Sequence, residues 1–212
     1  MDISSFIDFL SIVVFANILL AVFNLVPIPP LDGHHVLFAF LPDRFYAFKV
    51  LLQRYGFVIL IIFLLFFFGL LSPVMNWLFE ISTGQPYQNV RVLLFQMDKL
   101  IFFLLVIIPS AILHEWSHGY AADRLGDPTP RMAGRLTINP IPHIDPWGTL
   151  LLPFLLLYLT SGSFLFAYAK PVPFNPLALR WRRYGAAAVG FAGPLANLIL
   201  VLGLGILIRI LV

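Results

Sequence analysis

The sequence predicts an all-α polytopic membrane protein that forms a single domain over residues 1–212. The chain is 60% hydrophobic and only 11% charged, and it contains 22 phenylalanines. Apolar runs long enough to cross a bilayer recur along it, and the basic residues fall mainly in the loops between these runs. We therefore expect about four spanning helices, one re-entrant or hairpin segment, a short β element and an integral, multi-pass location in the membrane.

The first expected helix, 6–25, leads into a turn with three prolines in four positions, Pro27 to Pro30. Proline has no backbone N–H and disfavours helical backbone before it, so the helix ends there. Backbone carbonyls released at membrane depth need protein or water as partners. We therefore expect this turn, with Asp32 directly behind it, to be buried in the protein or to face a wet cavity.

The rest of the chain alternates between apolar and polar segments. Pro109 is expected to kink the helix at 99–120, and the polar–apolar alternation from Arg135 to Asn139 is typical of a short half-exposed strand. In order, we expect an amphipathic interfacial segment at 34–54, a spanning helix around 57–71, a polar return at 72–89, a spanning helix at 99–120, a polar loop at 126–143, an interrupted apolar segment at 147–168 and a last spanning helix at 185–212.

The orientation in the membrane depends on whether 147–168 crosses the bilayer or dips in and returns. If it returns, ten of the 13 Lys and Arg residues gather on the side where Asp32 emerges; if it crosses, the distribution is nearly even. The positive-inside rule prefers the uneven distribution. We therefore expect a re-entrant segment, four full spans, both termini on the non-cytoplasmic side and a functional site nearer the cytoplasmic face.

Two histidines and a glutamate close the 99–120 helix, in the stretch His114-Glu115-Trp116-Ser117-His118. Residues four apart lie one turn apart on one helix face, where both imidazoles can reach one Zn²⁺. The glutamate between them is turned off that face and is close enough to assist water without binding the metal. Burying three ionisable groups in hydrocarbon is costly, so the motif favours a catalytic zinc site. The alternative, a helix end that is merely polar, is less favoured.

A catalytic zinc with two histidines needs a third protein ligand. The chain has no cysteine, so this ligand must offer nitrogen or oxygen. Among the carboxylates, Asp32 and Asp145 are the two placed to reach the histidines. Asp32 is favoured because a rigid proline turn at the end of a spanning helix could aim it at the level of His118, and Asp145 stays the alternative.

These residues resemble the motifs of the site-2 protease family of intramembrane zinc metalloproteases. His114-Glu115-x-x-His118 lies on a membrane helix, and Asn24-x-x-Pro27-x-Pro29-x-Leu31-Asp32-Gly33 ends another. The similarity covers nearly the whole chain, and it is closest to compact bacterial and archaeal members without extra domains. Three further stretches carry it: Gly134 to Pro140, Ala169 to Pro176 and Gly193 to Asn197.

The resemblance implies one catalytic Zn²⁺ on His114, His118 and Asp32, with Glu115 as the catalytic base, in a protein of the prokaryotic cell membrane. It also implies two partners, the lipid bilayer and a transmembrane protein substrate that is cleaved within or near its membrane segment. The net charge of +3 is modest, and its placement in loops gives no reason to expect nucleic-acid binding.

The order of the two motifs departs from the family, in which the histidine motif precedes the aspartate motif. We interpret the chain as a circular permutant. Residues 89–212 would correspond to the family's N-terminal part and residues 1–85 to its C-terminal part, with the joint at 83–88. Permutation is tolerated where the old termini lie close together and the joints are exposed.

A helical substrate shields its own peptide bonds, so it must unwind before cleavage, and its backbone then needs new partners. An edge strand could supply them by strand addition. The segments 135–139 and 170–175 are the candidates, and plain interfacial loops are the alternative. Asn197 could steady an oxyanion, although a hydrogen bond between helices is favoured. The expected substrate-binding residues are Arg135, Leu136, Thr137, Ile138, Asn139, Lys170, Asn175 and Asn197.

Two other functional classes share some of these features. A metal transporter could carry a His-His-Asp site at mid-depth, but it would not need the glutamate, and the chain shows no pair of similar repeats. A scaffold with a structural zinc would fill all four metal positions with protein ligands. Metal uptake or peptide cleavage by the protein in liposomes would separate the first class from a protease.

Overall fold

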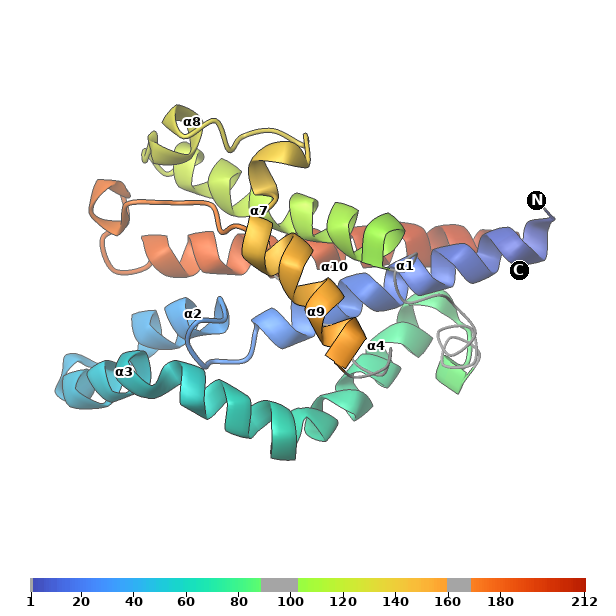
Figure 1. Ribbon diagram of the computed structural model, residues 1–212, viewed down its shortest axis with the longest axis horizontal. Helices are drawn as coiled ribbons and strands as arrows, with labels where there is room; N and C mark the ends of the chain where they lie inside the picture. Colours follow the sequence, from blue (N-terminus) through green and yellow to red (C-terminus); the bar gives the residue numbers. More distant parts are fainter. Residues whose placement is uncertain (1, 89–102, 160–168) are drawn as a thin grey trace.

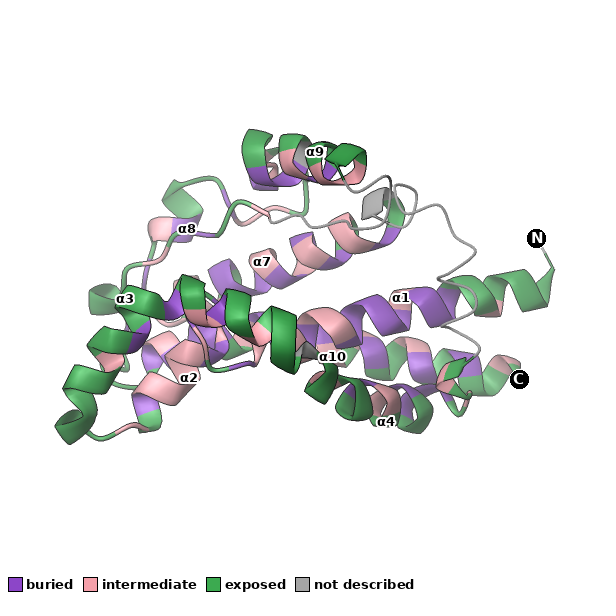
Figure 2. Cartoon of the chain, turned by 60° about the horizontal axis from the view of Figure 1, so that its bottom comes forward, coloured by how far each residue is buried: buried purple, intermediate pink, exposed green. Residues whose placement is uncertain are grey.

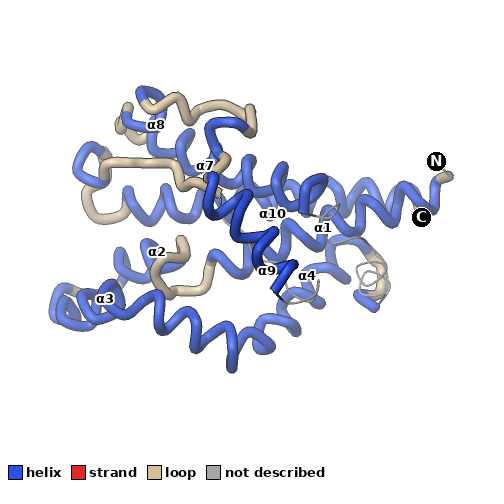
Figure 3. The backbone as a smooth tube through the Cα atoms, viewed as in Figure 1, coloured by secondary structure: helices blue, strands red, loops and turns tan. Residues whose placement is uncertain are grey.

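The computed structural model describes residues 2–88, 103–159 and 169–212. Its regular structure is helical, as Figures 1 and 3 show. The first and last helices lie close to their expected bounds. The α-helices are α1 (Ile3–Asn24), α2 (Gly33–Phe40), α3 (Tyr46–Ile62), α4 (Ser72–Thr83), α7 (Ile108–Arg124), α8 (Thr129–Met132), α9 (Leu152–Leu159) and α10 (Gly185–Leu211), and the shorter turns are η1 (Asp43–Phe45), η2 (Phe63–Phe67), η3 (Phe68–Leu71), η4 (Phe103–Ile107), η5 (Ile141–His143), η6 (Pro146–Leu151) and η7 (Pro176–Ala178).

Helix α10 is the centre of the bundle. It packs against α1, α2, α4 and α7, and Figure 1 shows it running beside α1 and α7. Small residues on α10 let its neighbours come close: a Cβ at Gly205 would lie 2.7 Å from the carbonyl oxygen of Ser82 in α4. Buried side chains of α1, α4 and α10 form one apolar cluster that includes Val14, Ile18, Phe79, Val201 and Ile208.

Three helices of the described chain are long and apolar enough to cross a bilayer: Ile3–Asn24, Asp43–Phe67 and Gly185–Leu211. Figure 2 shows α3 mostly exposed, whereas the middle of α1 is mostly buried. Large apolar side chains such as Phe57 and Val58 account for this exposed surface, which suits contact with lipid. The chain is a membrane protein, as its sequence predicts.

The expected span at 99–120 begins outside the described residues. Its described part is the π-helical turn η4, followed by α7. Pro109 lies in the first turn of α7, directly after η4, and its missing N–H removes one helical hydrogen bond at this junction. The change from π-helical to α-helical geometry falls here, and the expected kink stays a prediction. The total of four spans stays a prediction.

The segment 147–168 is described only in its first part. The π-helical turn η6 leads into the short helix α9, and residues 160–168 lie outside the described chain. Whether the segment crosses the bilayer or returns therefore stays a prediction.

The second span and the segment after it differ from expectation. The candidate span begins at Asp43, well before Phe57. Lys49 is tolerated near its start because its ammonium donates to the carbonyl oxygen of Phe38 at 2.8 Å. The expected polar return also contains a helix, α4. This helix ends at Gly84, whose φ of 72° is the left-handed conformation common just after helices.

The expected β element is wrong: the described residues contain no strand (Figure 3). Residues 135–139 form an irregular loop that bonds to itself and its neighbours. The side chain of Arg135 donates to the carbonyl of Pro142, and the carbonyl of Thr137 accepts from the imidazole of His143 at 2.9 Å. These local bonds compete with a strand ladder for the same polar groups, so the polar–apolar alternation does not produce a strand.

Candidate metal centre

The turn after α1 brings Asp32 back toward the bundle. Within the turn, the N–H of Leu31 donates to the carbonyl of Ile28 at 2.9 Å. A Cβ on Gly33 would lie 2.2 Å from the carbonyl oxygen of Leu25, so only glycine allows the chain to fold this closely onto the end of α1. Asp32 precedes α2 without capping it through its side chain. Its carboxylate is therefore free to face α7.

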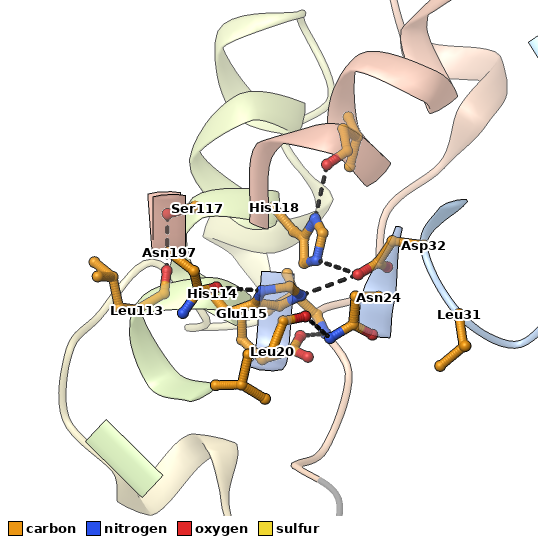
Figure 4. Close-up of polar contacts among 12 residues, drawn as sticks. Leu20, Asn24, Leu31, Asp32, Leu113, His114, Glu115, Ser117, His118 and Asn197 are labelled. Atoms are coloured by element: carbon orange, nitrogen blue, oxygen red, sulfur yellow. Dashed lines mark hydrogen bonds and ion pairs between the residues drawn. The ribbon is translucent and has the colours of Figure 1, made fainter. Parts of the chain in front are cut away.

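The carboxylate of Asp32 meets the two histidines of α7. One ligand atom from each of Asp32, His114 and His118 lies within 4.8 Å of the other two. The Oδ2 atom of Asp32 is 2.9 Å from Nε2 of His114 and 3.2 Å from Nε2 of His118. Figure 4 shows the three side chains converging, with both imidazoles buried. Two imidazole nitrogens and one carboxylate oxygen are a donor set that suits catalytic zinc, whereas Mg²⁺ and Ca²⁺ prefer oxygen alone.

The other nitrogen of each imidazole bonds to α10. His118 donates from Nδ1 to the carbonyl oxygen of Val189 at 2.7 Å, and Nδ1 of His114 lies 2.6 Å from Oδ1 of Asn197. A carbonyl oxygen can only accept, so Nδ1 of His118 carries the hydrogen and its Nε2 keeps a lone pair for a metal. Outer hydrogen bonds of this kind orient metal-binding histidines.

Gly193 of α10 packs directly against the metal-facing edge of both imidazoles. A Cβ at this position would lie 2.4 Å from Nε2 of His118 and 2.6 Å from Nε2 of His114, distances that real Cβ atoms essentially never show. The site therefore requires glycine here. The sequence marks Gly193 only as one of many small residues suited to helix packing, because nothing near it in the chain reveals its contact with α7.

Glu115 lies beside the three donor atoms without belonging to them. Its Oε2 accepts a hydrogen bond of 2.9 Å from the backbone N–H of Val172. Val172 stands between Pro171 and Pro173, which have no N–H, so the single donor of this stretch is directed at Glu115. We call the extended segment 170–175 the strap. It holds the glutamate carboxylate next to the metal centre.

The strap is fixed by further backbone bonds near both ends. The N–H of Lys170 donates to the carbonyl of His143 at 2.9 Å, and the N–H of Asn175 donates to the buried carboxylate of Asp127 at 2.5 Å. Burial raises the pKa of Asp127, but the hydrogen bonds from Thr129 and Asn175 outweigh burial and hold this pKa below its usual value. Asp127 is therefore a charged anchor for the strap.

Other residues singled out from the sequence lie away from the metal centre. The carboxylate of Asp145, the alternative third ligand, accepts from the N–H groups of Trp147 and Gly148 and so caps the turn η6. In the loop 135–139, the side chain of Arg135 is buried and donates to the carbonyl of Pro142, and Ile138 is 75% exposed. The structure brings Asp32, and not Asp145, to the two histidines.

Two polar residues of the site escape the sequence analysis. Asn17 of α1 and Ser110 of α7 are both buried, and both belong to the hydrogen-bonded chain that ends at Asn197. The available signal was an isolated polar residue within an apolar span, which usually has a partner or a function. The pairing itself joins helices far apart in sequence, so no local pattern could reveal it.

The fold and the site define a class: a helical membrane protein with a buried His-His-Asp metal centre. The model of peptidase family M50 matches residues 1–67, a stretch that includes Asp32. No solved structure is similar enough to count as a match.

Two bacterial relatives agree with this class. The chain is 37% identical over 110 residues to "Putative zinc metalloprotease YwhC" of Bacillus subtilis; these residues make up 52% of this chain and 46% of the relative. It is 37% identical over 102 residues to "Putative zinc metalloprotease Rip2" of Mycolicibacterium smegmatis; these residues make up 46% of this chain and 37% of the relative. The aligned region thus spans less than half the length of either relative. With the M50 match, these relatives support assignment of the chain to the site-2 protease family and support zinc as its metal.

Proposed function

We propose that this chain is a zinc metalloprotease that hydrolyses peptide bonds within or near the membrane-spanning segments of other proteins. The observation that carries the proposal is the cluster of Asp32 with the buried His114 and His118, with Glu115 held beside it. The relatives are named for zinc and proteolysis, and the M50 match points the same way. The site sits on helices of a membrane bundle, which favours a substrate that is itself in the membrane.

Each residue of the site has a distinct part in this reaction. Bound zinc supplies a Lewis acid that makes water nucleophilic near neutral pH and polarises a peptide carbonyl. Glu115 would take a proton from the attacking water as the new C–O bond forms, and would then pass it to the amine nitrogen, so that the C–N bond breaks and the amine leaves. His114, His118 and Asp32 hold the metal. The N–H of Val172 orients the carboxylate of Glu115.

The strap is the better of the two expected substrate-binding segments. It is extended backbone in direct contact with Glu115, whereas the cited bonds of the loop 135–139 go to the adjacent residues Pro142 and His143. The N–H groups of Lys170, Val172 and Asn175 are already engaged by the protein. An unwound substrate would therefore pair with carbonyl oxygens of the strap or displace one of these bonds.

The proposal is tested with the full chain in proteoliposomes, using zinc and a peptide that contains one membrane-spanning segment. We expect fragments whose masses place the cut within or near that segment. The membrane-permeable chelator phenanthroline should stop the reaction, and added zinc should restore it. An impermeant chelator should act faster from the cytoplasmic side, since we place the site nearer that face.

Two results would contradict the proposal. Zinc-loaded protein that cleaves none of a set of membrane-spanning peptides would remove the protease assignment. Zinc uptake into the liposomes without cleavage would favour the transporter.

We further propose that the chain has the family's two parts in exchanged order, 89–212 corresponding to the N-terminal part and 1–85 to the C-terminal part. Its two ends lie at the same end of the bundle in Figure 1. Arg209, near the C-terminus, donates to the carbonyls of Ser82 and Ile81 next to the joint. A reordered chain, 89–212 linked to 1–85, should bind one zinc as tightly as the original. Loss of zinc binding in a reordered chain that still inserts and folds would contradict the exchange.

A further inference from the structure

A chain of buried hydrogen bonds runs from α1 to His114 through residues that the proposed reaction does not use. Asn17 of α1 donates from Nδ2 to the carbonyl oxygen of Val13 at 2.8 Å and to Oγ of Ser110 at 2.9 Å. Asn197 of α10 donates from Nδ2 to Oδ1 of Asn17 at 2.6 Å. Its own Oδ1 lies 2.6 Å from Nδ1 of His114 (Figure 4). Neither asparagine is exposed at all.

The carbonyl oxygen of Val13, at the far end, sets the donor-to-acceptor direction of this whole series of hydrogen bonds. The carbonyl oxygen of Val13 can only accept, so Asn17 turns its amide nitrogen toward it and its amide oxygen toward Asn197. That oxygen can also only accept, so Asn197 offers its nitrogen to Asn17 and its oxygen to His114. A hydrogen is thereby placed on Nδ1 of His114, and Nε2 is left as the ring nitrogen that can bind a metal. Nε2 lies 2.9 Å from the carboxylate of Asp32, which can accept a hydrogen from it when no metal is bound.

Reversing either amide would be unfavourable at this depth. Two donors or two acceptors would then face each other, and a buried polar group would lose its partner. An asparagine that orients a histidine is otherwise ambiguous, because its amide can turn by half a rotation and offer nitrogen in place of oxygen. Asn17 removes the ambiguity at Asn197, and a longer bond of 3.4 Å from Nδ2 of Asn197 to the backbone carbonyl of Ser110 favours the same orientation.

We propose that Asn17 and Asn197 are positioning residues of the metal centre, which fix the hydrogen of His114 on Nδ1 and aim Nε2 at the zinc. The inference rests on the zinc site of the proposed function and does not depend on proteolysis. The partners of metal-binding histidines are commonly carboxylates, backbone carbonyls or water. Here the partner is a side-chain amide, and it needs a second residue on another helix to hold it.

The second histidine shows the contrast. His118 donates from Nδ1 to the backbone carbonyl of Val189, which cannot turn and needs no further support. The orientation of His118 therefore depends on the backbone of α10 alone. The orientation of His114 depends on the side chain of Asn197, which is held by Asn17 at 2.6 Å and more weakly by the backbone carbonyl of Ser110 at 3.4 Å, and it can be altered by substitution.

The competing explanation is that the asparagines only join helices. Hydrogen bonds between membrane helices stabilise bundles whether or not they touch a metal ligand. Such bonds would affect unfolding of the protein but not its affinity for zinc. Zinc affinity and the state of the His114 ring in metal-free protein therefore separate the two explanations.

The test uses full-length Asn197→Leu, Asn17→Leu and Asn197→Asp variants, with Thr83→Val as a control. Thr83 is 1% exposed and donates to the carbonyl of Phe79 in α4, so its replacement removes a buried hydrogen bond away from the metal centre. Zinc affinity is measured by competition with a chelator. Nitrogen NMR of ring-labelled histidine reports which ring nitrogen of His114 carries the hydrogen, and thermal unfolding of metal-free protein reports stability.

We expect Asn197→Leu to weaken zinc binding by about 10–100-fold, the usual effect of removing such a partner. Asn17 does not touch His114, so Asn17→Leu should weaken zinc binding by a smaller factor, about 3–10-fold. It should also give a mixture of protein molecules with and without a hydrogen on Nδ1 of His114. Asn197→Asp keeps an acceptor for the ring but turns its second oxygen toward the amide oxygen of Asn17, so its affinity should fall between those of Asn197→Leu and the unmodified protein. Thr83→Val should lower stability without changing zinc affinity.

Unchanged zinc affinity in Asn17→Leu, with the hydrogen still wholly on Nδ1, would overturn the proposal. So would an equal loss of zinc affinity in Thr83→Val, because the effect would then follow stability. If Asn197→Leu fails to fold, Asn17→Leu and Asn197→Asp still decide the question. A protein that binds zinc in this way but cleaves no peptide would contradict the proposed protease and leave this inference standing.

Discussion

The Glu115→Gln variant is expected to lose peptide cleavage while keeping its zinc. Glutamine has nearly the same shape and still offers an oxygen to the N–H of Val172, but it cannot take a proton from water. General acid–base catalysis is commonly worth about 10²–10⁴-fold in rate, so the loss should be at least of this size. Zinc content should not change, because Glu115 lies outside the three donor residues. Cleavage of a membrane-spanning peptide and metal analysis of the same sample measure both effects.

Glu80→Gln is the matched control for this substitution. Glu80 is an exposed carboxylate of α4, so its replacement makes the same chemical change away from the metal centre, and both cleavage and zinc content should stay as in the unmodified protein. Cleavage by Glu115→Gln at close to the original rate would remove Glu115 from the mechanism. Loss of zinc from this variant would instead mean that Glu115 helps to hold the metal.

A single methyl group at position 193 is expected to disrupt the metal centre. In Gly193→Ala the new Cβ would lie 2.4 Å from Nε2 of His118 and 2.6 Å from Nε2 of His114, so the imidazoles or α10 must move. Both imidazoles would be displaced from their metal-facing positions. We therefore expect zinc affinity to fall by more than the roughly 10–100-fold that follows loss of an outer partner, and cleavage to be lost with it. Chelator competition and the cleavage assay measure the two losses.

Gly203→Ala provides the control on the same helix. A Cβ at Gly203 would meet no atom within 4 Å, and both substitutions give the same gain in helix propensity, about 1 kcal/mol. This variant should bind zinc and cleave peptides as before. If Gly193→Ala also bound zinc with unchanged affinity, the close packing of α10 on the histidines would be wrong.

The sequence predicts best where the cause of a structure is local. The prolines from Pro27 to Pro30 end a helix wherever they occur, and α1 ends at Asn24, one residue before the expected bound. The spacing of His114 and His118 likewise places both on one face of any helix that contains them. Asp32 was favoured as their partner for a local reason, the rigid turn before it, and the structure brings its carboxylate to both imidazoles.

Prediction from the sequence fails where tertiary contacts determine the local structure or the role of a residue. The segment Ser72–Thr83 is polar enough to suggest a loop, yet it forms α4, because Met75 and Phe79 share a face and pack into the cluster with α1 and α10. The loop 135–139 has the alternation of a strand but bonds locally. Gly193 is one small residue among several on α10, and only the position of α7 shows which of them must remain a glycine.

Three of the α10 residues at the metal centre follow the repeat of the helix. Gly190 packs against the backbone oxygen of Asp32, Gly193 against the imidazoles, and Asn197 holds His114. Residues spaced by three and four share one side of a helix, so deleting one amino acid between Gly190 and Asn197 would swing the two ends about 100° apart. On the opposite side of α10, Ile199 and Leu202 are about 60% exposed, so other apolar residues can replace them. In natural or designed variants of this chain, we therefore expect substitutions to accumulate on the exposed side of α10 and to be rare on the side that faces the metal centre.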